Sequence, residues 1–85
     1  MKEERIGFVS HYFNKIGVAA VVLEGELGVG DAVHIKGLST DFTQKLKSMQ
    51  IEHKGVEHAK KGDDIAIKVK EYARERDVVY KVLEE

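Results

Sequence analysis

The sequence predicts an all-β fold, a small six-stranded antiparallel β-barrel. Short apolar runs rich in β-branched residues recur along the chain, with glycine, aspartate or asparagine between them. No stretch sustains the helical period of about 3.6 residues. Short strands without intervening helices are typical of an antiparallel barrel or a sandwich. The chain has 85 residues, enough for one hydrophobic core, so we expect a single domain over residues 1–85.

Six segments have the character of strands. Proline is absent, so the turns between them depend on glycine, aspartate and asparagine. In the third segment Val33 and Ile35 alternate with His34 and Lys36, which predicts one buried face and one face towards solvent. The only helical candidate is Val56–Lys61, which is too short for more than a turn or two. The six predicted strands are Arg5–His11, Gly17–Glu24, Ala32–Gly37, Gln44–His53, Asp64–Glu71 and Val78–Leu83.

The second predicted strand is apolar on both faces. Residues 18–23 read Val-Ala-Ala-Val-Val-Leu, which is more apolar surface than the inside of a small barrel uses. Another segment of the same domain or a partner must therefore cover the outer face. The predicted core residues of this strand are Val18, Ala20 and Val22, and the predicted outer face is Ala19, Val21 and Leu23.

The fourth predicted strand changes phase along its length. Leu46 is out of step with Met49 and Ile51, and a β-bulge near Lys47–Ser48 would restore the alternation. Together, the strands predict a core of Val18, Ala20, Val22, Leu27, Val33, Ile35, Met49, Ile51, Ile65, Ile67 and Val69.

A five-residue pattern that ends in aspartate occurs three times, each time before a strand. Glycine in its fourth position permits a positive φ, and the aspartate carboxylate can accept backbone N–H bonds. The third copy has Arg76 in place of glycine, so we expect strain or a different turn there. We interpret the pattern as turn chemistry rather than catalysis. The three copies are Leu27–Asp31, Ala59–Asp63 and Ala73–Asp77.

The first of these turns lies in a longer family motif. Gly25–Ile35 resembles the Gly-x-Leu-x-x-Gly-Asp-x-Val-x-Ile run in the β-barrel second domain of elongation factor Tu and related translational GTPases. Ser48–His53, Ala59–Asp63 and Asp77–Tyr80 follow in the family's order, so the resemblance covers almost the whole chain. It implies a translation-protein β-barrel of the Greek-key type. It also implies a non-catalytic module that docks on RNA, the ribosome or a translation factor.

The same resemblance allows a second function. Similar barrels occur at the end of some collagenase-like peptidases, so a shared fold does not fix one activity. The alternative is a protein-interaction subunit of an enzyme complex such as a collagenase-like peptidase, unrelated to translation.

The sequence departs from the translation family at two functional sites. It has no Gly-x-x-x-x-Gly-Lys-Ser/Thr phosphate loop, so we expect no GTP binding. The family holds the aminoacylated end of tRNA with a Glu and an Arg, and Gln50 and His53 occupy these places here, while an Asn of that pocket is replaced by Asp64. Loss of the carboxylate and of the planar guanidinium indicates that the tRNA pocket is not retained in its known form.

Composition narrows the classes of function. The net charge is −1, from 14 Lys and Arg against 15 Asp and Glu, which argues against salt-dependent, non-specific nucleic-acid binding but allows a local RNA contact. Cysteine is absent, which removes disulfides and thiolate zinc sites and favours a cytoplasmic location. No apolar run reaches membrane-spanning length, so no membrane association is expected. Abundant Lys and Glu with few amides are common in thermophile proteins.

No enzymatic, cofactor or metal site is expected. The four histidines lack a His-x-x-x-His spacing, and Asp63 and Asp64 are neighbours on a strand, so their carboxylates point to opposite faces. None of the serines lies in a Gly-x-Ser-x-Gly elbow.

The loop Tyr12–Lys15 is the strongest candidate for partner binding. Tyr12 and Phe13 are adjacent in an extended chain and cannot both face one core, so at least one ring is expected to be exposed. Aromatic rings beside Lys15 suit base stacking or a protein contact, although one ring can instead close the barrel end. The full set of predicted partner-binding residues is Tyr12, Phe13, Lys15, Ala19, Val21, Leu23, Gln50 and His53.

Overall fold

The computed structural model describes residues 2–83, which form ten antiparallel strands and contain no helix. The prediction of an all-β antiparallel fold is confirmed, whereas the predicted number of six strands is wrong. The strands are β1 (Lys2–Phe13), β2 (Val18–Leu23), β3 (Leu27–Gly28), β4 (Ala32–Lys36), β5 (Asp41–Lys45), β6 (Met49–Ile51), β7 (Lys54–Val56), β8 (His58–Ala59), β9 (Asp64–Lys68) and β10 (Val78–Leu83).

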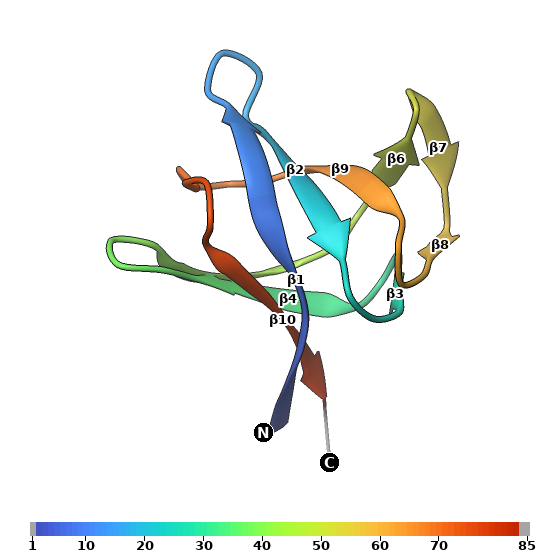
Figure 1. The fold of residues 1–85 in the computed structure, drawn as a ribbon, viewed down its shortest axis with the longest axis horizontal. Helices are drawn as coiled ribbons and strands as arrows, with labels where there is room; N and C mark the ends of the chain where they lie inside the picture. Colours follow the sequence, from blue (N-terminus) through green and yellow to red (C-terminus); the bar gives the residue numbers. More distant parts are fainter. Residues whose placement is uncertain (1, 84–85) are drawn as a thin grey trace.

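Eight of these strands form one coiled sheet, in the order β5-β4-β10-β1-β2-β9-β6-β7, and β3 pairs with β8 beside it. Figure 1 shows the large sheet curving around a central space, with the β1–β2 hairpin projecting beyond it. Within residues 2–83 the ladder does not close, because β5 and β7 remain its two edges. The predicted barrel, closed or nearly closed, is therefore not a closed one, and an open sheet coils around the core instead.

A side chain joins β5 to the end of β9, where the sheet lacks a ladder. Gln44 Nε2 donates to the Lys68 carbonyl at 2.8 Å, and Gln44 Oε1 accepts from the Lys70 N–H at 2.9 Å. A strand in this position would offer the same donor and acceptor from its backbone. We call the line between β5 and residues 68–70 the seam.

Two register shifts bend β1 as it passes between β10 and β2. One lies between Arg5 and Gly7 in the pairing with β10, and the other between Val9 and His11 in the pairing with β2. The first shift turns both Ile6 and Gly7 inward. A Cβ at Gly7 would lie 2.4 Å from the Val22 carbonyl oxygen, so the two strands approach this closely only because residue 7 is glycine.

The phase of β2 is opposite to the predicted one. The residues expected on its outer face, namely Ala19, Val21 and Leu23, are at most 1% exposed and belong to the core. Val18, Ala20 and Val22, which were expected inside, are half-buried on the other face. A strand that is apolar on both faces carries no phase signal of its own. Its neighbours decide instead, because Val21 pairs with the buried residues Val9 and Ile65 on either side.

Two further predictions need correction. Residues 46–48 lie outside any strand, so Gln44–His53 is not one strand and the change of phase comes from an interruption rather than a β-bulge. Leu46 and Met49 are nevertheless both buried, as the change of phase requires. The helical candidate Val56–Lys61 instead contains β8 and a turn, because His58 and Ala59 pair with β3.

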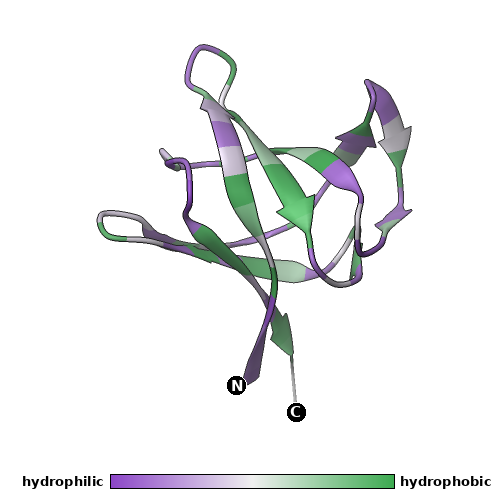
Figure 2. Cartoon of the chain, in the orientation of Figure 1, coloured by the Kyte–Doolittle hydropathy of each residue, from purple (hydrophilic) through white to green (hydrophobic). Residues whose placement is uncertain are grey.

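The rest of the predicted core is largely confirmed. Figure 2 shows hydrophobic residues along the strands that surround the interior, with hydrophilic colour on most turns. Ile51 is half-buried and packs against the core rather than within it. The predicted residues that the structure buries are Leu27, Val33, Ile35, Met49, Ile65, Ile67 and Val69.

All three copies of the turn pattern form the same hydrogen-bonded turn. The aspartate Oδ2 accepts the N–H of the residue three positions earlier, and the aspartate N–H donates back to that residue's carbonyl. The residue before the aspartate has a positive φ, which is 100° at Gly30, 95° at Gly62 and 75° at Arg76. Arg76 thus keeps the same turn and has a strained backbone, which was one of the two outcomes predicted from the sequence, the other being a different turn. The bonded pairs are Gly28–Asp31 at 2.8 Å, Lys60–Asp63 at 2.9 Å and Arg74–Asp77 at 2.9 Å.

We predict that Arg76→Gly stabilises the fold. A left-handed φ costs a non-glycine residue about 1–2 kcal/mol, and the greater freedom of glycine in the unfolded chain offsets about half of this, which leaves about 0.5–1 kcal/mol. Urea unfolding measures the difference. The matched control is Gly62→Arg, which has open space at its Cβ and should lose stability at the equivalent position. A less stable Arg76→Gly variant would contradict the strain at this turn.

His34 connects several strands on the outer face of the sheet. Its Nδ1 lies 2.7 Å from Glu3 Oε2 on β1, and its Nε2 lies 2.5 Å from Asp41 Oδ1 on β5. Its ring also lies 6.1 Å from that of Tyr80 on β10. The hydrogen bond to Asp41 raises the pKa of His34 above its ordinary value, Glu3 raises it further, and burial opposes both. In return, His34 lowers the pKa of Asp41.

We predict that thermal stability falls as pH rises above neutrality. The folded-state pKa of His34 exceeds its ordinary value of 6.5, so its contribution is complete below 6.5 and is lost as pH rises through the folded pKa. The pKa of Asp41 lies below its ordinary 3.8, so its contribution is present above 3.8 and is lost as pH falls through the folded pKa. Melting temperatures measured from pH 6.5 upward, through the folded-state pKa of His34, should fall in the wild type and not in His34→Gln. Parallel curves for the two proteins would refute this role of His34.

Candidate protein-interaction site

Two loops of the coiled sheet each contact the same third loop. The three loops are residues 14–17 between β1 and β2, residues 37–40 between β4 and β5, and residues 69–77 between β9 and β10. The Val69 N–H donates to the Gly17 carbonyl at 2.9 Å, which joins the first loop to the third. Gly37 lies against Asp77, since a Cβ at Gly37 would meet Asp77 Oδ1, which joins the second loop to the third. We call these three loops, with the adjoining end of β1, the loop end; in Figure 1 the tips of the 14–17 and 37–40 loops project in different directions on either side of the third loop.

Aromatic and charged side chains pack together at the loop end. The Tyr12 and Tyr72 rings lie 4.7 Å apart between centroids, and the Arg74 guanidinium lies 5.7 Å from the Tyr72 centroid. The His11 ring contacts Phe13 edge-on at 4.4 Å, and its Nδ1 lies 3.0 Å from Glu75 Oε2. These contacts hold the rings in place with part of their surface open to solvent.

The structure confirms that Tyr12 and Phe13 face different environments. Tyr12 is half-buried and packs against the core, whereas Phe13 is 45% exposed. Tyr12 therefore closes the end of the core, which was the alternative role predicted for one of the two rings. Phe13 is the ring available to a partner. The Lys15 side chain is exposed in the same hairpin loop.

The loops of the loop end also carry exposed apolar side chains. Among residues 2–83, five large hydrophobic residues are exposed, and all but Val29 lie on this end: Phe13, Ile16, Leu38 and Tyr72. The sequence did not predict Ile16, Leu38 or Tyr72 as binding residues. Each is a lone apolar residue in a loop, so it has no place in an alternating pattern. Their only sequence signal is an apolar residue within a turn, which is weak evidence when taken singly.

The other predicted binding residues lie elsewhere. Gln50 and His53 are exposed on the β6–β7 hairpin, away from the loop end in Figure 1. Glu52 and His53 have φ values of 51° and 67°, which the tight turn of this hairpin requires. The remaining predicted residues, Ala19, Val21 and Leu23, lie in the core, where no partner can reach them.

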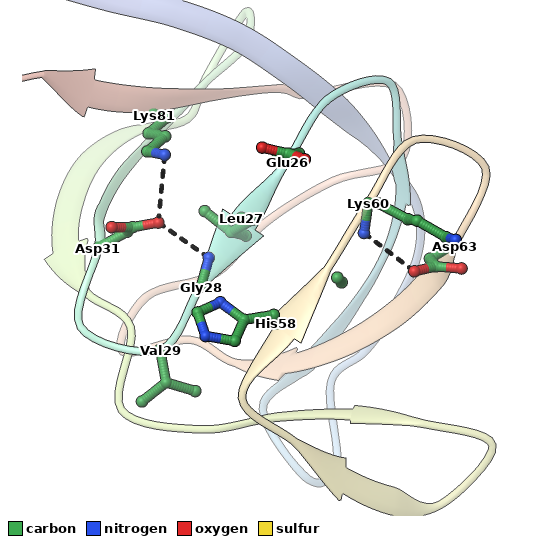
Figure 3. A pocket seen from close by; sticks show the side chains of 10 residues that line it. Glu26, Leu27, Gly28, Val29, Asp31, His58, Lys60, Asp63 and Lys81 are labelled. Carbon is green, nitrogen blue, oxygen red and sulfur yellow. Dashed lines mark hydrogen bonds and ion pairs between the residues drawn. The ribbon is translucent and has the colours of Figure 1, made fainter.

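A hollow of about 540 Å³ lies beside the β3–β8 pair (Figure 3). Of its three carboxylates, those of Asp31 and Asp63 already have partners. Asp31 Oδ2 accepts the Gly28 N–H and lies 3.5 Å from Lys81 Nζ, and Asp63 accepts the Lys60 N–H. Because these groups hold the turns together, we assign the hollow a structural role. Within residues 2–83, no group of three His, Asp or Glu side chains is placed to hold a metal ion.

Two curated relatives share much of this sequence. An uncharacterized protease of Methanocaldococcus jannaschii is 42% identical over 76 residues, which are 88% of this chain and 19% of the protease. A collagenase of Porphyromonas gingivalis is 42% identical over 72 residues, which are 82% of this chain and 20% of the collagenase. The chain thus spans about a fifth of the length of these relatives. No protein-family model matches the sequence.

Solved structures agree with these relatives. The C-terminal domain of a Geobacillus thermoleovorans protein assigned to the U32 peptidases superposes with a TM-score of 0.88 at 24% identity, over 94% of this chain and 93% of that domain. Its selenomethionine variant gives a TM-score of 0.85, over 89% and 96% of the two chains. At this level of identity, the structural match establishes the fold.

The prediction of a translation-factor module is therefore wrong, together with its RNA, ribosome and translation-factor partners. The motif that suggested it contains a turn whose aspartate bonds its own backbone, here Asp31 on the Gly28 N–H. Such a motif specifies how the chain turns into a strand and says little about what the surface binds. The relatives favour the alternative prediction, a protein-interaction subunit of an enzyme complex such as a collagenase-like peptidase, over the translation module. No helix in the described part of the chain is long and apolar enough to span a membrane.

Proposed function

We propose that this chain is a non-catalytic protein-binding module of a peptidase-type protein or complex, and that its loop end docks on a polypeptide. The exposed side chains of Phe13, Ile16 and Tyr72, on two loops that contact each other, carry this proposal. Burying such a side chain is worth about 1.5–3 kcal/mol, and clustered exposed apolar side chains are typical of an interaction site. Tyr and Arg, represented here by Tyr72 and Arg74, are enriched among the residues that dominate binding energy.

The polar side chains support a non-catalytic role. Ser10 Oγ donates to the Ala20 carbonyl, and the His11 and His34 rings bond to carboxylates. Within residues 2–83, these hydrogen bonds include no Ser–His pair of the kind that activates a nucleophile. We further propose that the peptidase activity named in the relatives resides in the part of those proteins that this chain does not match. A cytoplasmic location remains our expectation, based on the absence of cysteine.

Calorimetry tests the docking. The chain is titrated into the Methanocaldococcus jannaschii protease from which the matching 76 residues are deleted, and separately into denatured collagen. We predict binding to at least one of these polypeptides. The double variant Phe13→Asp, Ile16→Asp should bind about tenfold to a hundredfold more weakly, because it places two charges where apolar anchors are buried.

The matched control is Val29→Asp, which places the same charge on the exposed apolar residue outside the loop end. It should bind like the wild type, and circular dichroism should show all the variants folded. Equal weakening by the control and the double variant, or no binding to either polypeptide, would contradict the proposal.

A further inference from the structure

A groove of about 680 Å³ runs along the seam between β5 and residues 68–70. Lys45 and Lys47 lie on one wall and Lys68 and Lys70 on the other. The Gln44 amide spans the floor through its bonds to the Lys68 carbonyl and the Lys70 N–H. The groove therefore results directly from the missing ladder between β5 and β9, and it adjoins the loop end, with which it shares only residues 69 and 70.

The two walls present their lysines in the same way. Lys45 and Lys47 flank Leu46, which is 1% exposed, and Lys68 and Lys70 flank Val69, which is 7% exposed. Since successive side chains of an extended chain alternate between faces, the buried residue in each wall turns both of its lysines outward. All four lysines are exposed.

The positive charge of the groove is not balanced locally. No carboxylate lines the groove. Among residues 2–83, the ion pairs involve other side chains and leave these four lysines without an acidic partner. Their aliphatic stems and Val69 supply apolar contact beneath the ammonium groups. Four like charges around one groove repel each other, so an anionic occupant is favoured.

We propose that this groove binds an extended, carboxylate-rich segment of a partner protein. Alternate residues of an extended chain are about 6.6–6.8 Å apart, so the two lysines of each wall repeat at the spacing of alternate side chains in an extended peptide. Glu or Asp at every second position can thus meet Lys45 and Lys47, or Lys68 and Lys70, in register. This goes beyond docking at the loop end, because it adds a second surface that recognises charge rather than apolar groups.

Two observations favour a peptide over a nucleic acid. No aromatic side chain lines the groove, so an unpaired base has no ring on which to stack. The net charge of the whole chain is −1, so the lysines of the groove are a local feature and not part of a basic domain.

Fluorescence anisotropy tests the groove with a labelled peptide of alternating glutamate and serine. We predict binding that weakens as salt is added. The double variant Lys45→Gln, Lys68→Gln should lose about tenfold in affinity. The double variant Lys60→Gln, Lys61→Gln removes the same charge from exposed lysines outside the groove and should bind like the wild type. Amide NMR shifts on adding the peptide should concentrate at Thr43 and residues 68–70.

Three results would overturn the proposal. One is no binding of the acidic peptide by the folded wild-type chain. Another is an equal loss of affinity in the two double variants, which would mean a response to total charge alone. The third is tighter binding of a single-stranded oligoribonucleotide than of the peptide, displaced by the same pair of groove substitutions.

Discussion

The structure depends on bending one antiparallel sheet around its own apolar face without a continuous ladder to close it. Two register shifts in β1 provide part of the bend, and Gly7 lets β1 pass close to the Val22 carbonyl. At the seam, Gln44 supplies a donor and an acceptor where a neighbouring strand would do so. The core is thus enclosed on all sides although β5 and β7 remain edges in the described part of the chain.

In this fold, several acidic side chains stabilise turns and strands, whereas two other surfaces are accessible to partners. The carboxylates of Asp31, Asp63 and Asp77 are bonded to the backbone of their own turns, and those of Glu3 and Asp41 to His34. The two surfaces that we propose as accessible to a partner are the apolar loop end and the lysine-lined groove at the seam. Both surfaces combine loop residues with the ends of strands, where a rigid β scaffold can vary without loss of its core.

The parts of the fold set by local chemistry could be predicted from sequence. The three aspartate turns and the alternation of β4 and β9 are of this kind, as is the division of Tyr12 and Phe13 between two environments. The phase of β2 could not be predicted, because it is apolar on both faces and depends on Val9 and Ile65 across the ladder. The loop residues of the candidate site and the two walls of the groove come together only through long-range packing. The translation function was inferred from a turn motif, which constrains the backbone and not the partner.

Amide hydrogen exchange at Lys70 tests most directly whether Gln44 closes the sheet. Lys70 lies outside every strand, yet its N–H donates to Gln44 Oε1. We expect this amide to be protected in the wild type and to exchange about tenfold faster in Gln44→Met, which keeps the side-chain length but removes both hydrogen bonds. Amides of the β1–β2 ladder should keep their rates. An unchanged rate at Lys70 in Gln44→Met would show that the seam is closed by something other than this side chain.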